Sequence, residues 1–169
     1  MNSKENIVFL GMMGSGKTSI GKLISKKLNL NFFDVDEQIE IELGLKISKI
    51  FLNKGEKYFR EVEEKKTLEL LENKKSIIAI GGGAFLNKNI RKEITENHLS
   101  FWLKWSNETL INRIRNSRKR PLAFNTTIEN LNNLIKKRSN IYSKALYKID
   151  CDNLTKNEIM NKILNIYDN

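Results

Sequence analysis

Short apolar runs alternate with amphipathic stretches along the chain, and this pattern predicts the secondary structure. Short strands are expected at residues 6–10, 31–35, 76–80, 99–103 and 147–151, and the apolar pattern is clearest at 76–80. Between them, helical periodicity predicts one helix that ends at Leu28 and others over residues 55–72, 108–115, 127–146 and 157–167. Strands and helices that alternate in this way indicate an α/β fold, in which helices cover both faces of a parallel sheet.

Some reactive or aromatic side chains are predicted to be structural. His98 stands alone before an apolar strand, which indicates a surface or edge position, and Cys151 is expected to be a small buried apolar residue. Trp102 and Trp105 lie around the end of a predicted strand and are expected to pack. In the long helix over residues 55–72, Val62, Leu68 and Leu71 form the predicted apolar stripe.

Length and composition indicate one globular domain over residues 1–169. The chain has 169 residues, of which 40% are hydrophobic and 30% charged, and this is enough to bury a core without disulfides. Cys151 is the only cysteine, so a reducing cytoplasm is expected. The run Ile7–Leu10 is too short for a signal peptide, and no later run could span a bilayer. We expect a cytoplasmic monomer with no membrane partner.

The formal net charge of +10 could indicate a nucleic-acid partner. Most of the excess lysine is spread along the chain, however, and this is typical of solvated faces. The exception is one basic cluster, formed by Arg113, Arg115, Arg118, Lys119 and Arg120. Because a nucleoside triphosphate is itself a polyanion, this cluster does not require a nucleic acid.

The segment Gly11-Met-Met-Gly-Ser-Gly-Lys17-Thr18 fits the phosphate-binding pattern G-x-x-x-x-G-K-[ST]. It lies between a predicted strand and a predicted helix, where its backbone N–H groups and the helix N-terminus can point at phosphate oxygens. Lys17 can reach the β- and γ-phosphates, and the Thr18 hydroxyl can bind Mg²⁺. The segment therefore predicts binding of ATP with Mg²⁺, through Gly14, Ser15, Gly16, Lys17, Thr18 and Ser19.

Two carboxylates, Asp34 and Asp36, follow the second predicted strand. Strand alternation would place both on one side, where one can hold hydrated Mg²⁺ and the other can accept a proton from an attacking hydroxyl. The alternative is a helix N-cap, since Asp36 opens a helical stretch and aspartate is favoured at such caps.

Three consecutive glycines, Gly81-Gly82-Gly83, follow the third predicted strand. Such a run suggests that backbone approaches a ligand closely, although a tight turn is the alternative. Arg60, in the segment YFREVEE, would by itself indicate only a solvated helix residue.

With these motifs the chain resembles the shikimate kinase family along nearly its whole length. The segments GMMGSGKT, FFDVD, FREVE, IIAIGGGAF, RPLA and RSNIYSKA occur in the order and spacing of that family, although Asn140 replaces a proline of the last motif. The resemblance implies an enzyme that transfers the γ-phosphoryl group of ATP to the 3-hydroxyl of shikimate, in the pathway to the aromatic amino acids. It also implies a three-layer P-loop kinase fold with a five-stranded parallel sheet in the order 2-3-1-4-5 and a mobile lid.

The same resemblance implies roles for individual residues. Asp36, Arg60, Gly82 and Arg138 match the shikimate-binding positions, in a substrate-binding region over about residues 34–61. Arg120 belongs to the lid, at about residues 113–125, and contacts the ATP phosphates, while Arg113 falls near the adenine. The expected catalytic residues are then Lys17, Asp36 and Arg120, and the expected ligands of one Mg²⁺ are Thr18 and Asp34.

The chemistry of the acceptor agrees with these implied roles. Two guanidinium groups suit the carboxylate of shikimate, because each presents a planar fork of donors. A carboxylate such as Asp36 suits a hydroxyl that must be oriented and lose a proton. Phosphoryl transfer depends mainly on alignment and charge neutralisation, which Lys17, Mg²⁺ and Arg120 can supply.

Other functions fit the sequence less well. Another small P-loop kinase, acting on gluconate or a nucleoside monophosphate, would share the phosphate loop and lid, but not the combination of Asp36, Arg60, three glycines and Arg138. A nucleotide switch would need a guanine-reading N-K-x-D segment and an RNA-binding module an aromatic motif, and the sequence contains neither.

Overall fold

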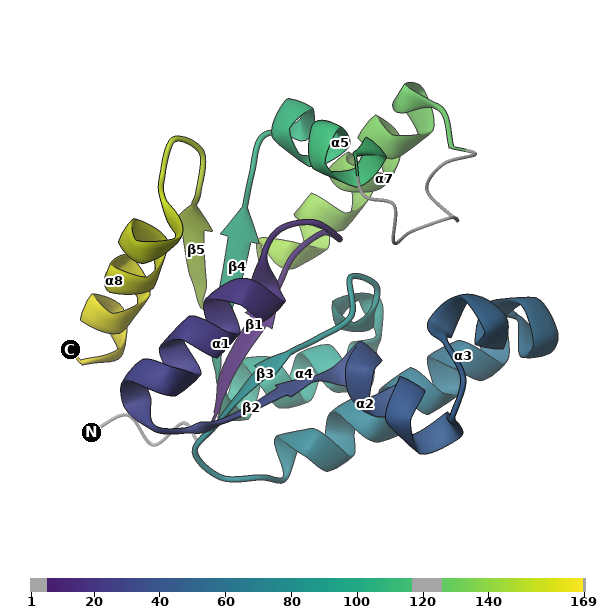
Figure 1. Ribbon diagram of the computed structural model, residues 1–169, viewed down its shortest axis with the longest axis horizontal. Coiled ribbons are helices and arrows are strands. Elements are labelled where there is room, and N and C mark those ends of the chain that lie inside the picture. The colour runs from purple at the N-terminus through teal and green to yellow at the C-terminus, as the bar shows by residue number, and fades with distance from the viewer. Residues whose placement is uncertain (1–5, 117–125, 169) are drawn as a thin grey trace.

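A five-stranded parallel sheet forms the centre of the protein, as a computed structural model of residues 6–116 and 126–168 describes it (Figure 1). Its strands are β1 (Ile7–Leu10), β2 (Asn31–Asp34), β3 (Ser76–Ala79), β4 (Leu99–Lys104) and β5 (Tyr147–Asp150). They are arranged in the order β2-β3-β1-β4-β5, and every pairing is parallel. The predicted fold class and strand order are confirmed.

Helices cover both faces of the sheet, because the apolar residues of its central strand point alternately to the two sides. In β1, Ile7 and Phe9 pack with α1 (Lys17–Leu28) and α8 (Lys156–Tyr167), while Val8 and Leu10 face the opposite core. The helices on that second side are α2 (Val35–Leu43), α3 (Ile47–Leu71), α4 (Lys88–Asn97), α5 (Asn107–Arg115) and α7 (Ile128–Tyr142). The three predicted layers are therefore present.

The long helix α3 begins earlier than predicted. It starts at Ile47, and Gly55, with φ 82° and ψ 170°, interrupts it at the residue where the predicted helix began. A positive φ is easily adopted only by glycine, so Gly55 allows two helical segments to join at a kink.

The buried face of α3 also differs from the predicted stripe. Leu71 is buried, but Val62 and Leu68 are only partly buried, and the helix instead buries Phe59, Glu63, Thr67 and Leu70. These residues recur every three or four positions and therefore share one face. Glu63 therefore lies on the buried face of the helix, which was predicted to be apolar.

Other differences reflect packing that local patterns do not record. The helix α7 ends at Tyr142, four residues earlier than predicted, and α4 was not predicted because Ile90 and Ile94 are its only buried residues. His98 was expected at the surface or an edge, but its side chain is only 2% exposed, so a surface position is wrong. Cys151 is buried, as predicted.

None of the helices in the described part of the chain combines the length and the apolar character that crossing a membrane requires.

Candidate active site

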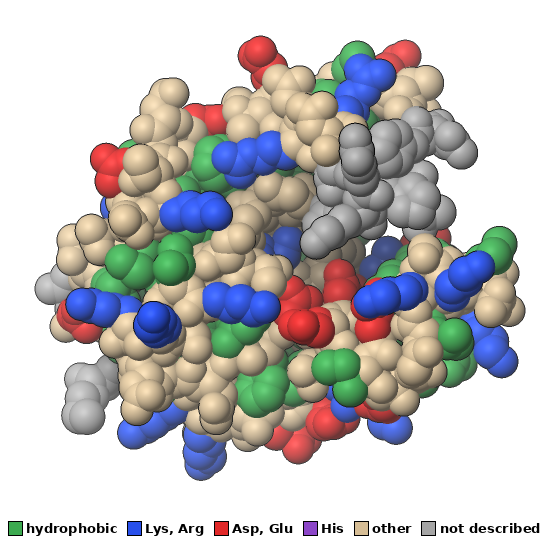
Figure 2. All heavy atoms as spheres, viewed as in Figure 1, with side chains coloured by type: hydrophobic (Ala, Val, Ile, Leu, Met, Phe, Trp, Pro, Cys, Tyr) green, Lys and Arg blue, Asp and Glu red, His purple; other side chains and the backbone are tan. Residues whose placement is uncertain are grey.

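The phosphate loop, the glycine run and the two aspartates follow the carboxyl ends of strands, where ligands of open α/β sheets bind. The strand order determines how they are distributed. The central strand β1 leads into the phosphate loop (residues 11–18), and β3 and β2 on one side lead into Gly81-Gly82-Gly83 and the two aspartates. On the other side, β4 leads into α5. Figure 2 shows a hollow on one face of the molecule, with acidic side chains on its lower edge and basic side chains deeper inside.

The phosphate loop has the backbone that its glycines predict. Gly14 and Gly16 have φ values of 79° and 90°, and α1 begins at Lys17, directly after the loop. Lys17 Nζ donates hydrogen bonds to the carbonyl oxygens of Gly11, at 2.8 Å, and Met12, at 3.1 Å. The ammonium is thus held above the loop at the N-terminus of α1, where anions are favoured. Ser19 follows as an exposed residue in the first turn.

Asp34 and Asp36 do not share one side of a strand, so that prediction is wrong. Strand β2 ends at Asp34, whose carboxylate caps α2 by accepting from Glu37 N, and Asp36 lies in the first helical turn. The helix cap is therefore Asp34, not Asp36. Asp34 Oδ2 also accepts a hydrogen bond from Thr18 Oγ1 at 2.6 Å, which brings the two predicted magnesium ligands together.

Asp36 lies instead beside the glycine run, together with side chains from two other helices. A Cβ atom added at Gly81 would meet Glu63 and lie 3.0 Å from Asp36 Oδ1; one at Gly82 would lie 3.3 Å from Arg138 Nη1; and one at Gly83 would collide with the Arg60 guanidinium. Each glycine thus leaves room for a charged group. The three glycines allow a close approach of protein side chains, whereas the predicted approach of a ligand stays a prediction. The run brings together the four predicted shikimate-binding residues, Asp36, Arg60, Gly82 and Arg138.

Glu63 holds Arg60 in this cluster. Its carboxylate accepts from Arg60 Nη1 at 2.6 Å, and its side chain is only 3% exposed, whereas the second partner of Arg60, Glu56, is largely exposed. Burial raises the pKa of Glu63, and the nearby charge of Asp36 adds to this effect, while Arg60 opposes it. Sequence reasoning missed Glu63, although its position four residues after Phe59 on a buried helix face could have indicated it.

Tyr142 connects the glycine run to α7. Its hydroxyl donates a hydrogen bond to the Gly82 carbonyl, and its ring packs against Trp102 with centroids 5.9 Å apart. Tyr142 follows Arg138 by four residues, so both side chains lie on the same face of α7. Burial raises the pKa of Tyr142 to about 12, which keeps the hydroxyl protonated and able to donate. The sequence motif contained Tyr142, but nothing local showed its partner.

Arg113 lies beside the phosphate loop, on the other side from the glycine run, and its place near the adenine stays a prediction. Its Nη1 donates to the Gly14 carbonyl at 3.4 Å, and its guanidinium carbon lies 3.6 Å from the ring centre of Trp105. Residues 117–125 of the predicted lid, which include Arg120, lie outside the described residues.

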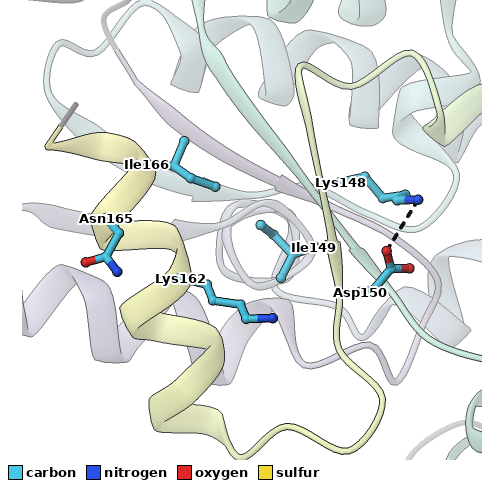
Figure 3. A pocket seen from close by; sticks show the side chains of 6 residues that line it. All are labelled: Lys148, Ile149, Asp150, Lys162, Asn165 and Ile166. Carbon is cyan, nitrogen blue, oxygen red and sulfur yellow. Dashed lines mark ion pairs between the residues drawn. The ribbon is translucent and has the colours of Figure 1, made fainter.

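A separate shallow pocket lies between β5 and α8 and contains none of the predicted site residues (Figure 3). Lys148 pairs there with Asp150 at 3.3 Å. The pocket is lined by Lys148, Ile149, Asp150, Lys162, Asn165 and Ile166.

The fold and the site together define a P-loop kinase, with a phosphate loop after the central strand and a cluster of charged side chains beside it. Comparison with known proteins specifies the family. A family profile described as shikimate kinase matches residues 13–168, and the shikimate kinase of Thermodesulfovibrio yellowstonii is 39% identical over 97% of this chain and 95% of its own. The shikimate kinase of Bacillus subtilis is 36% identical over 95% of this chain and 88% of its own. The chain belongs to the shikimate kinase family.

Solved structures agree with this assignment. The structure of shikimate kinase from Acinetobacter baumannii in complex with shikimate superposes with a TM-score of 0.90, at 30% identity, over 98% of this chain and 93% of that one. A deoxyadenosine kinase from M. mycoides reaches a TM-score of 0.64 at 20% identity, over 96% of this chain and 98% of that one, which shows a shared fold alone. The predicted family and enzyme class, an ATP-dependent kinase that acts on a hydroxyl of shikimate, are confirmed.

Proposed function

We propose that Arg60 and Arg138 bind the carboxylate of shikimate, while Asp36 orients its 3-hydroxyl and accepts the proton as the phosphoryl group arrives. The observation that carries this assignment is the convergence of these three side chains on Gly81-Gly82-Gly83. Arg138 Nε adds to it, because this buried donor has no hydrogen-bond partner among the described residues. A buried unpartnered donor is costly, and a carboxylate ligand would satisfy it.

The nucleotide occupies the other half of the site in this proposal. The backbone of Gly14, Ser15 and Gly16 binds the phosphates, with Thr18 and Ser19 at the start of α1, and Lys17 neutralises the charge that develops on the transferred group. Arg120 supports the same charge from the lid, a role that rests on the sequence motif alone. Because the acceptor lies on the β2–β3 side of β1 and Arg113 on the β4 side, the two substrates meet above the phosphate loop.

Thr18 and Asp34 suit one Mg²⁺ bound together with ATP. Their oxygen atoms are 2.6 Å apart at the start of α1, and a hydroxyl with a carboxylate is a donor set that Mg²⁺ prefers. In residues 6–116 and 126–168 no group of three or more acidic, histidine or cysteine side chains could hold a metal ion. The ion would therefore depend on substrate phosphates for further ligands, and when bound it would neutralise phosphate charge.

We also propose that residues 1–169 act as one domain in a cytoplasmic monomer. The free, buried thiol of Cys151 is compatible with a reducing compartment. Light scattering at working concentration tests the monomer, and a mass of two chains would contradict it.

A coupled assay of ADP release tests the acceptor site. We expect turnover with shikimate and little or none with gluconate or nucleoside monophosphates. Shikimate methyl ester, which has lost the carboxylate charge, should be a poor substrate of the wild-type protein.

A variant of the arginine cluster makes this test specific. Arg138→Ala should raise the KM for shikimate at least tenfold. The same variant should raise the KM for the ester much less, because it removes a partner of the carboxylate, which the ester lacks. Lys137→Ala removes the charge of an exposed neighbour on α7 and is the matched control. An equal rise in the KM of Arg138→Ala for shikimate and for the ester would show that Arg138 does not bind the carboxylate.

A further inference from the structure

Trp105 lies between the phosphate loop and α5, the helix that carries Arg113. It stands between the last residue of β4, Lys104, and Ser106, the N-cap of α5. Its half-buried ring packs against the apolar clusters on both faces of the sheet, so its position is fixed by contacts from two sides. A side chain held in this way can serve as a platform for a more exposed neighbour.

Two polar contacts of Trp105 and Arg113 reach the phosphate loop independently. The indole N–H of Trp105 donates to the Ser15 carbonyl at 2.9 Å, and Arg113 Nη1 donates to the Gly14 carbonyl at 3.4 Å. Between them, the guanidinium carbon lies 3.6 Å from the centre of the Trp105 ring, which is the closest cation–π contact in the described part of the chain. The phosphate loop, the Arg113 guanidinium and the Trp105 indole therefore each contact the other two.

We propose that Trp105 is a positioning residue for the nucleotide: its indole holds the Arg113 guanidinium beside the phosphate loop, with the opposite guanidinium face toward the adenine base. This inference rests on the proposed role of Arg113. Arg113 is an exposed side chain near the end of α5, and an arginine in such a position loses much rotamer freedom when it binds a ligand. The stack on Trp105 restricts the guanidinium before the nucleotide arrives, so binding costs less.

The contacts also distinguish this role from simple support of the loop. Support through Ser15 depends only on the indole N–H, which phenylalanine lacks, whereas the stack on Arg113 needs an aromatic face, which phenylalanine retains in weaker form. Trp105→Phe and Trp105→Leu therefore separate the two contributions. Leucine removes both the hydrogen bond and the stack.

Calorimetric titration with a non-hydrolysable ATP analogue measures the effect directly. We expect Trp105→Leu to weaken binding of the analogue about two- to fivefold beyond Trp105→Phe, the range of an exposed cation–π contact, with the affinity for shikimate unchanged. In the Arg113→Ala background, Trp105→Leu should bind the analogue no more weakly than Trp105→Phe, because the partner of the stack is gone. Equal affinities of the two Trp105 variants with Arg113 present, or the same difference between them after Arg113→Ala, would overturn the proposal.

Fluorescence provides a test that does not require any change at Trp105. The chain has two tryptophans, so Trp102→Phe leaves Trp105 as the single emitter. The ATP analogue should change its emission, and Arg113→Ala should remove most of that change. The same emission change with and without Arg113 would refute the coupling. If the wild-type protein does not turn over shikimate and ATP, the proposed function fails instead, which is a separate result from the same preparations.

Discussion

Replacing Tyr142 with phenylalanine tests whether the acceptor site depends on the contact between α7 and the glycine run. The change removes one hydroxyl, which donates to the Gly82 carbonyl, and leaves the buried ring against Trp102. Since Arg138 lies one turn earlier on the same face of α7, the lost contact loosens two groups of the proposed shikimate site together.

The size of the effect follows from the burial of the two partners. Tyr142 is 1% exposed, but Gly82 is only half-buried, so water can replace part of the lost hydrogen bond. We therefore expect the free energy of unfolding to fall by about 1–2 kcal/mol, which lowers the Tm of a protein of this size by roughly 2–8 °C. If about 1 kcal/mol of this reaches the bound state, the KM for shikimate rises about fivefold.

Steady-state kinetics with each substrate varied in turn measures this prediction. The KM for shikimate should rise, while kcat and the KM for ATP stay within about twofold, because the contact lies on the acceptor side of β1. Tyr147→Phe is the matched control, since Tyr147 packs on the opposite face of the sheet, against Phe101. A normal KM for shikimate in a variant with lowered Tm would show that Tyr142 serves stability alone.

Three further variants test the charged groups of the site. Lys17→Met should nearly abolish turnover while circular dichroism shows an intact fold, because the ammonium is bonded to loop carbonyls and not to the core; near wild-type activity would refute its phosphate role. Asp36→Asn should lower turnover at least a hundredfold while the ATP analogue still binds, since it keeps the shape and removes the proton acceptor; unchanged turnover would restrict Asp36 to a structural role. Glu63→Gln should alter the pH dependence of stability. Because the pKa of Glu63 is raised, the folded state binds more protons than the unfolded state above the ordinary carboxyl pKa of 4.5. This residue therefore makes the free energy of unfolding decrease as pH rises. The variant should lose that part of the slope in denaturant titrations above pH 4.5, and an unchanged slope would contradict the raised pKa.

Several features of the site depend on partners that are distant in the sequence. Glu63 reads as one more charge in a highly charged helix until Phe59 and Thr67 are seen to be buried on its face. Tyr142 and Gly82 are 60 residues apart, and Trp105 and Ser15 are 90 apart. No local pattern specifies such pairs, because the strand order brings them together. The two aspartates illustrate the same limit: the sequence predicted a shared side, but the start of α2 turns Asp34 toward Thr18 and Asp36 toward the glycine run.

The sequence by itself determined the features whose physical causes are local. Apolar patterns of strand length and helical periodicity specified the five strands and most of the helices, although not α4. The phosphate loop was recognisable because all of its groups lie within eight consecutive residues. The tertiary structure decided how charge is distributed over the proposed acceptor site. Glu63, Arg60 and Arg138 belong to helices that can meet only when β3 packs between β2 and β1, and each glycine of the run then leaves space for one of their charged groups. Burial at that junction raises the pKa values of Glu63 and Tyr142, and this effect depends on the neighbouring elements and not on the residues themselves.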